Sequence, residues 1–201
     1  MNYQMFKKKS RIILVPLVNL FVRLKVNPSI LTVTGFLLNC LVAYIFSFGF
    51  FRWAAIVLIL ASIFDAVDGE VARKNKRVTA FGAFLDSTVD RYSEFVIFLG
   101  IFIYYIRVEN PFFVFVTLFS LFGSCMVSYT RARAEGLGIS CTVGLFDRTL
   151  RVTTIIIGAL LGSFIFGYFL LLIACFSQFT SFQRIIYVRK KLKSNERRTN
   201  A

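Results

Sequence analysis

The chain has 201 residues, of which 57% are hydrophobic, and its mean hydropathy is +0.72. This composition is rare in soluble proteins and typical of proteins with several transmembrane helices. The formal net charge of +14 does not indicate nucleic-acid binding, because the basic residues flank apolar segments and do not form one stripe. The sequence contains no histidine, which excludes histidine-based catalysis and histidine metal ligands.

The first predicted element is an amphipathic helix at the membrane interface, within residues 1–26. Its apolar part, residues 12–22, is too short to span a bilayer and contains Pro16 and Asn19. Lysines and an arginine precede it in residues 7–11, and Arg23 and Lys25 follow where a signal peptide would have its small-residue cleavage site. We therefore expect an interfacial helix and no cleavable signal peptide.

Six apolar stretches follow, judged against the roughly 20 residues that a membrane span needs. They cover Ile30–Phe48, Trp53–Val71, Phe81–Ile106, Pro111–Thr130, Val152–Phe166 and Gly167–Tyr187. The fifth is the shortest, and Gly162, Ser163 and Gly167 mark its turn into the sixth. The predicted fold is all-α, a polytopic membrane protein formed by one domain over residues 1–201. Its six-helix core occupies residues 27–189, and a basic tail occupies residues 190–201.

Basic residues assign the predicted helix ends to the two sides of the membrane. They concentrate in residues 7–11, 73–77, 131–151 and 184–198, which are alternate loops or termini. The opposite loops carry only Arg52 and Arg107 as basic residues. The positive-inside rule therefore predicts a multi-pass protein of the cell membrane with both termini in the cytoplasm.

Four aspartates within the second and third predicted spans are the candidate site: Asp65, Asp68, Asp86 and Asp90. A carboxylate inside a bilayer is costly, so such a residue usually faces a polar cavity and has a function there. The first two are three residues apart and the last two are four apart, so each pair lies on one helical face. An antiparallel hairpin of the two helices brings all four together near the cytoplasmic side.

Converging carboxylates repel one another unless cations neutralise them. Mg²⁺ and Mn²⁺ take oxygen ligands and are commonly bound by carboxylates together with substrate phosphates. Two such ions would also activate a nucleophile and bind a phosphoryl group. Gly69, Ala72 and Gly82 share the helical faces of the aspartates, where small side chains let a nucleotide approach the backbone. The structural alternatives are helix packing for these small residues and helix-end solvation for Asp68 and Asp86.

The whole string, D-x-x-D-G-x-x-A-R, eight residues, then G-x-x-x-D-x-x-x-D, resembles the signature of the CDP-alcohol phosphatidyltransferases. Its fixed positions are Asp65, Asp68, Gly69, Ala72, Arg73, Gly82, Asp86 and Asp90. The resemblance covers nearly the whole chain. It implies transfer of a phosphatidyl group from a CDP-linked lipid, CDP-diacylglycerol, to an alcohol, with release of CMP.

The resemblance also implies roles for single residues. The four aspartates would bind a pair of Mg²⁺ or Mn²⁺ ions, and Asp90 would in addition be the catalytic base. The CDP-lipid would lie beside Gly69, Ala72, Arg73, Gly82 and Thr32, the last of which belongs with Pro28 to a P-x-x-x-T element. For Arg73, anchoring of the loop is an equally good interpretation. A homodimer is expected from the family.

A second group of residues concerns the acceptor alcohol. Arginines gather where predicted cytoplasmic helix ends meet: Arg131, Arg133, Arg148, Arg151 and Arg184. The planar arginine fork suits phosphate, so these residues predict an anion pocket, whereas simple topological anchoring is the alternative. The S-Y-x-R-A-R-A-E stretch, the following G-L-F-D-R and the late Gln-Arg resemble phosphatidylinositol phosphate synthases. That resemblance implies that Arg131, Arg148 and Arg184 hold the phosphate of inositol 1-phosphate.

Two departures keep other functions open. Arg131 stands where a lysine is common, and Asp147 where a glutamate is common. Glycerophosphate-transferring relatives have a similar arginine run, so a phosphatidylglycerophosphate synthase using glycerol 3-phosphate is an alternative, as is an archaeal ether-lipid enzyme of either kind. A cation transporter is the alternative from another class, and Glu94, one turn beyond Asp90, favours it. The clustering of the aspartates near one side favours the enzyme.

Overall fold

The computed structural model describes residues 15–75 and 79–199, with side chains up to residue 194. Its elements are α2 (Pro28–Ser47), α3 (Phe51–Lys74), α4 (Ala80–Arg107), α5 (Pro111–Glu135), α6 (Arg148–Leu161) and α7 (Ser163–Thr199), and a short helix over residues 15–23 precedes them. All regular secondary structure in this part of the chain is helical, which confirms the all-α prediction. The basic residues predicted to precede the interfacial helix, residues 7–11, lie outside the described residues.

Four of the described helices begin with a side-chain cap, at Asn27, Thr79, Asn110 and Asp147. In each, the side-chain oxygen accepts a hydrogen bond from a backbone N–H of the first turn, a donor that has no partner inside the helix. The cap at Asp147 bears most directly on the site, because it makes Arg148 the first residue of α6.

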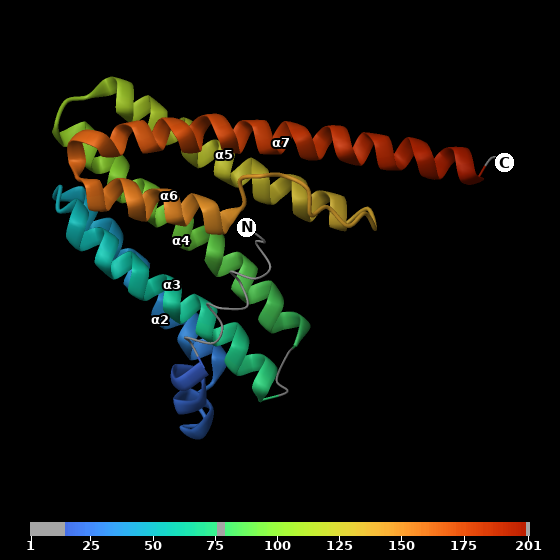
Figure 1. Ribbon diagram of the computed structural model, residues 1–201, viewed down its shortest axis with the longest axis horizontal. Coiled ribbons are helices and arrows are strands. Elements are labelled where there is room, and N and C mark those ends of the chain that lie inside the picture. Colours follow the sequence, from blue (N-terminus) through green and yellow to red (C-terminus); the bar gives the residue numbers. More distant parts are fainter. Residues whose placement is uncertain (1–14, 76–78, 200–201) are drawn as a thin grey trace.

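The helices form two groups that diverge from a common end (Figure 1). Helices α2, α3 and α4 run together in one group, and α5 lies along α7 in the other, while α6 packs against both α7 and α3. The last turns of α7 extend beyond all other helices (Figure 1). The main apolar core lies where the two groups meet and joins Phe46, Phe51 and Phe166, whose rings are 4.8 to 5.5 Å apart.

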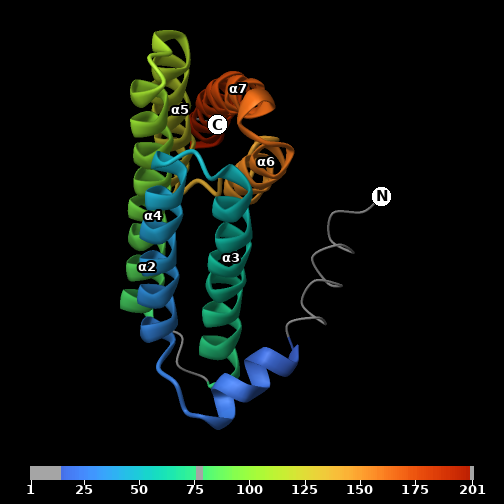
Figure 2. The ribbon, with the colours of Figure 1, turned by 90° about the vertical axis from the view of Figure 1, so that its left-hand side faces the viewer.

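The short helix of residues 15–23 lies across the ends of α2 and α3 (Figure 2). Its Val18 packs with Leu31, Val67 and Val71 in a second, smaller apolar cluster. The Nζ atom of Lys74 donates a 2.6 Å hydrogen bond to an asparagine of the short helix, Asn19. These contacts fix the end of α3 that carries the predicted site.

Three described helices are long and apolar enough to cross a membrane by length and composition: Pro28–Ser47, Pro111–Glu135 and the Ser163–Ser194 part of α7. Helices α3 and α4 carry the aspartates, and α6 has only 14 residues. The molecule thus has the apolar helices of an integral membrane protein.

The turn between the fifth and sixth spans was predicted at Gly162, Ser163 and Gly167; its place at Gly162 and Ser163 is confirmed, and the division of the spans at Phe166 and Gly167 is wrong. Helix α6 ends at Leu161 and α7 begins at Ser163, several residues before the expected break at Phe166 and Gly167. The physical reason is Gly162, which adopts a φ of +102° that other residues rarely adopt. At the other end α6 includes Arg148 and Arg151, which the sequence had placed before the span.

Close packing of α4 on α2 depends on Gly100. A Cβ atom at this position would lie 2.2 Å from the carbonyl oxygen of Ala43, in the backbone of α2. We therefore expect Gly100→Ala to lower the free energy of unfolding by about 1–3 kcal/mol, because the two helices must separate. Thermal unfolding in detergent measures this. Gly35→Ala is the matched control, because its Cβ would lie 3.9 Å from its neighbours and should fit without loss. Equal stability of the two variants would contradict the prediction.

Candidate active site

Three of the four predicted aspartates converge. Oxygen atoms of Asp65 on α3 and of Asp86 and Asp90 on α4 lie within 4.8 Å of one another. The sequence spacing accounts for part of this convergence, because Asp86 and Asp90 occupy successive turns on one face of α4. Helix α2 packs against both α3 and α4 and so holds them on either side of the cluster. The antiparallel course of α3 and α4 thus brings together three of the four aspartates that the hairpin was predicted to gather.

Asp68 is placed differently from the other three. Its side chain is buried, and its Oδ2 atom accepts a 2.7 Å hydrogen bond from the hydroxyl of Thr32 on α2. Thr32 in turn lies one helical turn after Pro28, whose carbonyl oxygen is 3.2 Å from the same hydroxyl. The P-x-x-x-T element of α2 thus meets the aspartate string directly, and the metal-ligand role of Asp68 stays a prediction.

Arg148 connects the aspartate cluster to α6. Its Nη1 atom is 3.0 Å from Oδ2 of Asp65 and 2.6 Å from Oδ1 of Asp90. Because Arg148 occupies the first turn of α6, the Asp147 cap and the site contact depend on the same local structure. A residue predicted for phosphate binding therefore also contacts two predicted metal ligands.

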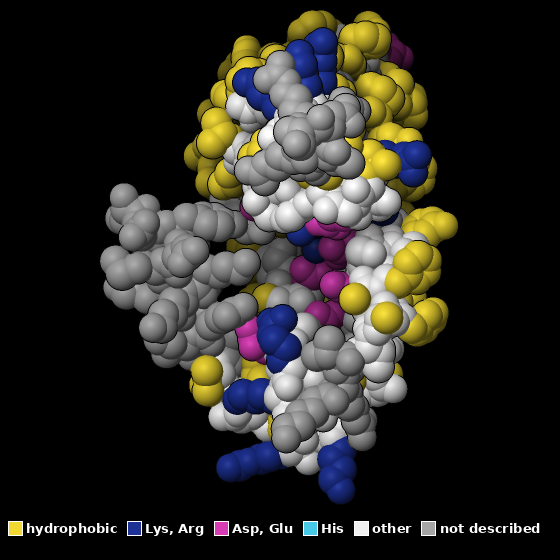
Figure 3. Space-filling view, turned by 90° about the vertical axis from the view of Figure 1, so that its right-hand side faces the viewer, with side chains coloured by type: hydrophobic (Ala, Val, Ile, Leu, Met, Phe, Trp, Pro, Cys, Tyr) yellow, Lys and Arg dark blue, Asp and Glu magenta, His cyan; other side chains and the backbone are white. Residues whose placement is uncertain are grey.

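A large cavity opens beside the cluster, between α4, α5, α6 and α7. Its volume is about 750 Å³, and we call it the arginine cavity. It is lined by Asp86, Asp90, Arg91, Ser128, Arg131, Arg148, Arg151 and Arg184, among others. On one face of the molecule, acidic side chains gather in a recess with basic side chains beside them (Figure 3). Carboxylates and guanidinium groups thus line one space.

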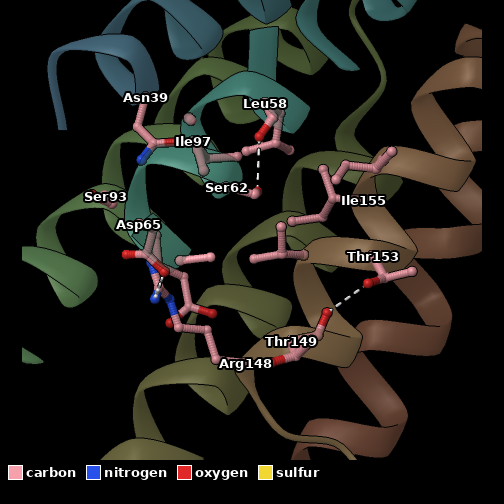
Figure 4. Close-up of a pocket in the computed structure, with 15 residues that line it drawn as sticks. Asn39, Leu58, Ser62, Asp65, Ser93, Ile97, Arg148, Thr149, Thr153 and Ile155 are labelled. Carbon is pink, nitrogen blue, oxygen red and sulfur yellow. Dashed lines mark hydrogen bonds and ion pairs between the residues drawn. The ribbon is translucent and has the colours of Figure 1, made fainter. Parts of the chain in front are cut away.

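A smaller cavity of about 240 Å³ lies on the other side of Arg148, between α2, α3, α4 and α6. Figure 4 shows Asp65 and Arg148 pointing toward each other at one end of this apolar cavity, with Asn39 and Ser93 along its wall. Most of the remaining wall is apolar and includes Leu58, Ile97 and Ile155. Arg148 lines both cavities.

The predicted phosphate-binding arginines have different surroundings. Arg131, at the rim of the arginine cavity, forms a 2.9 Å exposed ion pair with Glu135. Arg184 is buried and donates to the carbonyl oxygens of Val143, at 2.9 Å, and of Val127. These contacts hold α7 to the loop before α6 and to α5.

The other two predicted arginines differ more sharply. Arg133 is exposed and does not line the arginine cavity. Arg151 lines it but is 1% exposed, and its guanidinium group is paired with Glu94. Phosphate binding by either residue stays a prediction.

Sequence reasoning missed Arg91. It follows Asp90 on α4, lies 3.6 Å from the Asp90 carboxylate and donates to the hydroxyl of Ser128 on α5. Both Arg91 and Ser128 line the arginine cavity. Its place in the sequence could have indicated this, because Arg91 directly follows Asp90, the last aspartate of the string, and therefore lies at the same level of the helix.

The residues predicted to adjoin the CDP-lipid lie around the ends of α3 and α4. Gly69 and Ala72 are on α3, one turn beyond Asp65 and Asp68, and Gly82 is in the first turn of α4, where its N–H is capped by Thr79. Arg73 is largely exposed and forms a 2.8 Å ion pair with Glu70. Both roles of Arg73, contact with the CDP-lipid and anchoring of the loop, stay predictions.

The donor set fits a divalent cation. Three carboxylates whose oxygens lie within 4.8 Å can all contact one small ion, and oxygen is the ligand that Mg²⁺ and Mn²⁺ prefer. No other such group of acidic or cysteine side chains is found in the described part of the chain. The cluster also opens to the arginine cavity, which leaves room for a ligand.

Comparison with known proteins identifies the family. The sequence profile of the CDP-alcohol phosphatidyltransferases matches residues 25–188. The chain belongs to this family. It is 39% identical to the archaetidylinositol phosphate synthase of Methanothermobacter thermautotrophicus over 85% of this chain and 87% of the relative.

Solved structures agree with this assignment. The fold matches that of the phosphatidylinositol phosphate synthase of Mycobacterium tuberculosis with CDP-DAG bound, with a TM-score of 0.78 and 30% identity, over 86% of this chain and 92% of that one. The same mycobacterial enzyme in complex with manganese and citrate matches with a TM-score of 0.77 and 30% identity, over 86% and 87% of the two chains. As a member of the CDP-alcohol phosphatidyltransferase family, this chain is a metal-dependent transferase.

Proposed function

We propose that this enzyme transfers the phosphatidyl group of CDP-diacylglycerol to a hydroxyl group of inositol 1-phosphate, giving phosphatidylinositol phosphate and CMP. The observation that carries the proposal is the arginine cavity, which joins Asp86 and Asp90 to Arg131, Arg148 and Arg184 in one space. A phosphorylated acceptor placed there would meet guanidinium groups on one side and carboxylates on the other. The names of the similar proteins support inositol phosphate over glycerol 3-phosphate as the acceptor.

Asp65, Asp68, Asp86 and Asp90 would hold two Mg²⁺ or Mn²⁺ ions. When bound, the ions supply charge stabilisation for the transferring phosphoryl group and for the departing CMP. Asp90 accepts the proton of the acceptor hydroxyl, because it lines the arginine cavity where that hydroxyl would lie. Thr32, Gly69, Ala72, Arg73 and Gly82 would surround the CDP-lipid.

The acceptor phosphate would contact Arg131, Arg148 and Arg184, all of which line the arginine cavity. Arg148 would then contact the acceptor phosphate as well as Asp65 and Asp90. Binding of the phosphate would thereby place the acceptor hydroxyl near Asp90, which takes its proton. Arg133 lies outside the lining of the arginine cavity and Arg151 is paired with Glu94, so the proposal assigns the phosphate to the other three arginines.

One experiment tests the proposal as a whole. Purified protein is incubated with Mn²⁺, a CDP-linked lipid and one acceptor at a time, and the lipid product is identified by mass spectrometry. Inositol 1-phosphate, glycerol 3-phosphate and free inositol are compared, with CDP-diacylglycerol and its ether-linked archaeal counterpart as donors. We expect phosphatidylinositol phosphate from the first acceptor. Better use of free inositol or of glycerol 3-phosphate would refute the assignment of the acceptor.

Replacing Arg131 by alanine should raise the KM for inositol 1-phosphate about tenfold or more, because a hydrogen bond to a charged group is worth about 1.5–3 kcal/mol. The KM for the CDP-lipid should change much less, since the metal site holds its pyrophosphate. Steady-state kinetics with each substrate varied in turn measure both constants. Arg189→Ala, an exposed change on α7 outside the cavity lining, is the control. An unchanged acceptor KM would make Arg131 a topological anchor.

We further propose six membrane spans formed by α2 to α7, with the short helix of residues 15–23 at the interface and both termini in the cytoplasm. The positions of the basic residues support this topology. Reporter tags at both ends and in the loop after Lys74 should be protected from external protease, whereas a tag beside Glu109 should be cleaved. External access to the carboxy terminus would require a different number of spans. A homodimer in this membrane is expected from the family resemblance.

A further inference from the structure

Glu94 and Arg151 form a buried ion pair that the proposed chemistry does not use. Glu94 is 7% exposed and Arg151 is 1% exposed. The Nε and Nη2 atoms of Arg151 donate to the two carboxylate oxygens of Glu94 at 2.7 and 3.3 Å, and its Nη1 atom donates to the carbonyl oxygen of Phe146 at 3.2 Å. All three kinds of guanidinium nitrogen therefore have partners within the protein.

Stability is a weak explanation for such a pair, because burying two charges costs about as much free energy as their attraction returns, and apolar replacements are often as stable. Ion conduction does not explain the pair, because the Glu94 carboxylate is satisfied by a fixed guanidinium group. Direct binding of the acceptor would account for only part of this arrangement, since three of the five N–H groups of Arg151 already bond Glu94 and Phe146. A positioning role remains, and the location of the pair supports it.

The pair lies one helical turn from the active-site contact on both helices. Glu94 follows Asp90 by four residues on α4, and Arg151 follows Arg148 by three residues on α6. The Asp90–Arg148 contact of 2.6 Å and the Glu94–Arg151 contact of 2.7 Å are therefore adjacent links between the same two helices. Two links at successive turns prevent α6 from rotating or sliding along α4.

The third bond of Arg151 reaches the segment that starts α6. Phe146, which accepts it, directly precedes the Asp147 cap and lies two residues before Arg148. The Phe146 N–H also donates to the hydroxyl of Thr180 on α7, at 3.2 Å. Arg151 thus fixes the backbone from which the Arg148 side chain extends.

We infer that Glu94 and Arg151 are a positioning pair, which holds the first turn of α6 against α4 so that Arg148 stays between the aspartates and the arginine cavity. The pair acts on the acceptor only through Arg148. The kinetic part of this inference rests on the proposed function, whereas its effect on metal binding does not.

A double-mutant cycle between Arg151→Lys and Arg148→Ala tests the inference. Lysine keeps the charge at residue 151 but lacks the planar fork that bonds Glu94 and Phe146 together. We expect Arg151→Lys to raise the acceptor KM about tenfold or more, as the loss of a supporting contact commonly does. In the Arg148→Ala background it should add less than about twofold, because the residue through which it acts is gone. Arg107→Lys is the matched control, since Arg107 bonds the carbonyl oxygen of Ser47 at the opposite end of α4.

Mn²⁺ affinity, measured by electron paramagnetic resonance on the same variants, is the independent readout. Arg148→Ala removes a cation from two metal ligands, so Mn²⁺ should bind more tightly. Arg151→Lys should change the affinity in the same direction, and the double variant should equal Arg148→Ala. A parent enzyme that binds Mn²⁺ but transfers lipid to no phosphorylated acceptor would refute the proposed function. The Mn²⁺ affinities of the two single variants and the double variant would still test the positioning role of the pair.

Several outcomes overturn the inference. If the increase in acceptor KM of the double variant equals the product of the two single increases, Arg151 acts on the acceptor independently of Arg148. Unchanged KM and Mn²⁺ affinity with a lower thermal stability would make the pair purely structural. If Arg151→Lys does not fold, Glu94→Asp, which keeps both charges and shortens the carboxylate arm, takes its place with the same expectations. Failure of both to fold, while Arg107→Lys folds, would also make the pair a requirement of the fold only.

Discussion

Asparagine in place of Asp65 or Asp86 should abolish lipid transfer. The change keeps the shape of the side chain but removes a charged oxygen ligand from a cluster whose atoms lie within 4.8 Å of one another. Metal ions supply several kcal/mol of transition-state stabilisation, so we expect a fall in kcat/KM of about a thousandfold or more. The measurements are CMP release from the CDP-lipid and Mn²⁺ binding by electron paramagnetic resonance, and both signals should be lost.

The control for this prediction is Glu109→Gln, which makes the same acid-to-amide change in the loop between α4 and α5. It should leave both signals unchanged, because that loop is at the opposite end of α4 from the aspartates. Normal turnover in both aspartate variants would refute the metal site itself. Loss of turnover with unchanged Mn²⁺ binding would assign the two residues to substrate contact.

Asp90→Asn should separate the chemical step from binding. Loss of a general base typically reduces the rate by about a hundredfold to ten-thousandfold, and we expect this fall in kcat. The variant should still bind CDP-lipid, because Asp65, Asp68 and Asp86 remain. Equilibrium binding of CDP-lipid and single-turnover rates measure the two effects on one preparation. If Mn²⁺ binding is lost together with turnover, Asp90 is mainly a metal ligand and the proposed division of roles is wrong.

The aspartate cluster was predictable because it depends on local rules. Spacings of three and four residues put pairs of aspartates on one helical face, and the short loop between the helices requires them to run antiparallel. Helix starts were predictable for a similar reason, since α2 and α5 begin at prolines preceded by asparagine caps. The first four spans, which were predicted from the apolar stretches, begin within two residues of α2, α3, α4 and α5.

The contacts of Arg148 could not be predicted from the sequence, because they depend on packing between segments that are far apart in the chain. Arg148 and Asp65 are 83 residues apart, and nothing local relates α6 to α3. The same holds for Glu94, which suggested an ion path until its partner 57 residues away was known. Asp68 matches the family string like its neighbours, yet the hydroxyl of Thr32 on another helix gives it separate surroundings.

The end of α6 shows a different kind of error. Gly162, Ser163 and Gly167 were all predicted to mark the turn, and the two spans were divided at the last of these residues. The backbone instead turns at Gly162, which takes a positive φ. The boundary between α6 and α7 is therefore set by the backbone freedom of a glycine and not by a change in hydrophobic composition.

The position of Arg148 in the walls of both cavities has a consequence for inhibitor design. The apolar cavity and the arginine cavity are neighbours that share this side chain. A compound that joins a lipid-like group to a phosphorylated polyol would need a linker only long enough to pass one guanidinium group. Short linkers of this kind give effective concentrations in the millimolar range, and affinity can rise by about a hundredfold to ten-thousandfold over either fragment. Two weakly binding fragments, one for each cavity, would thus be a practical starting point for a selective inhibitor.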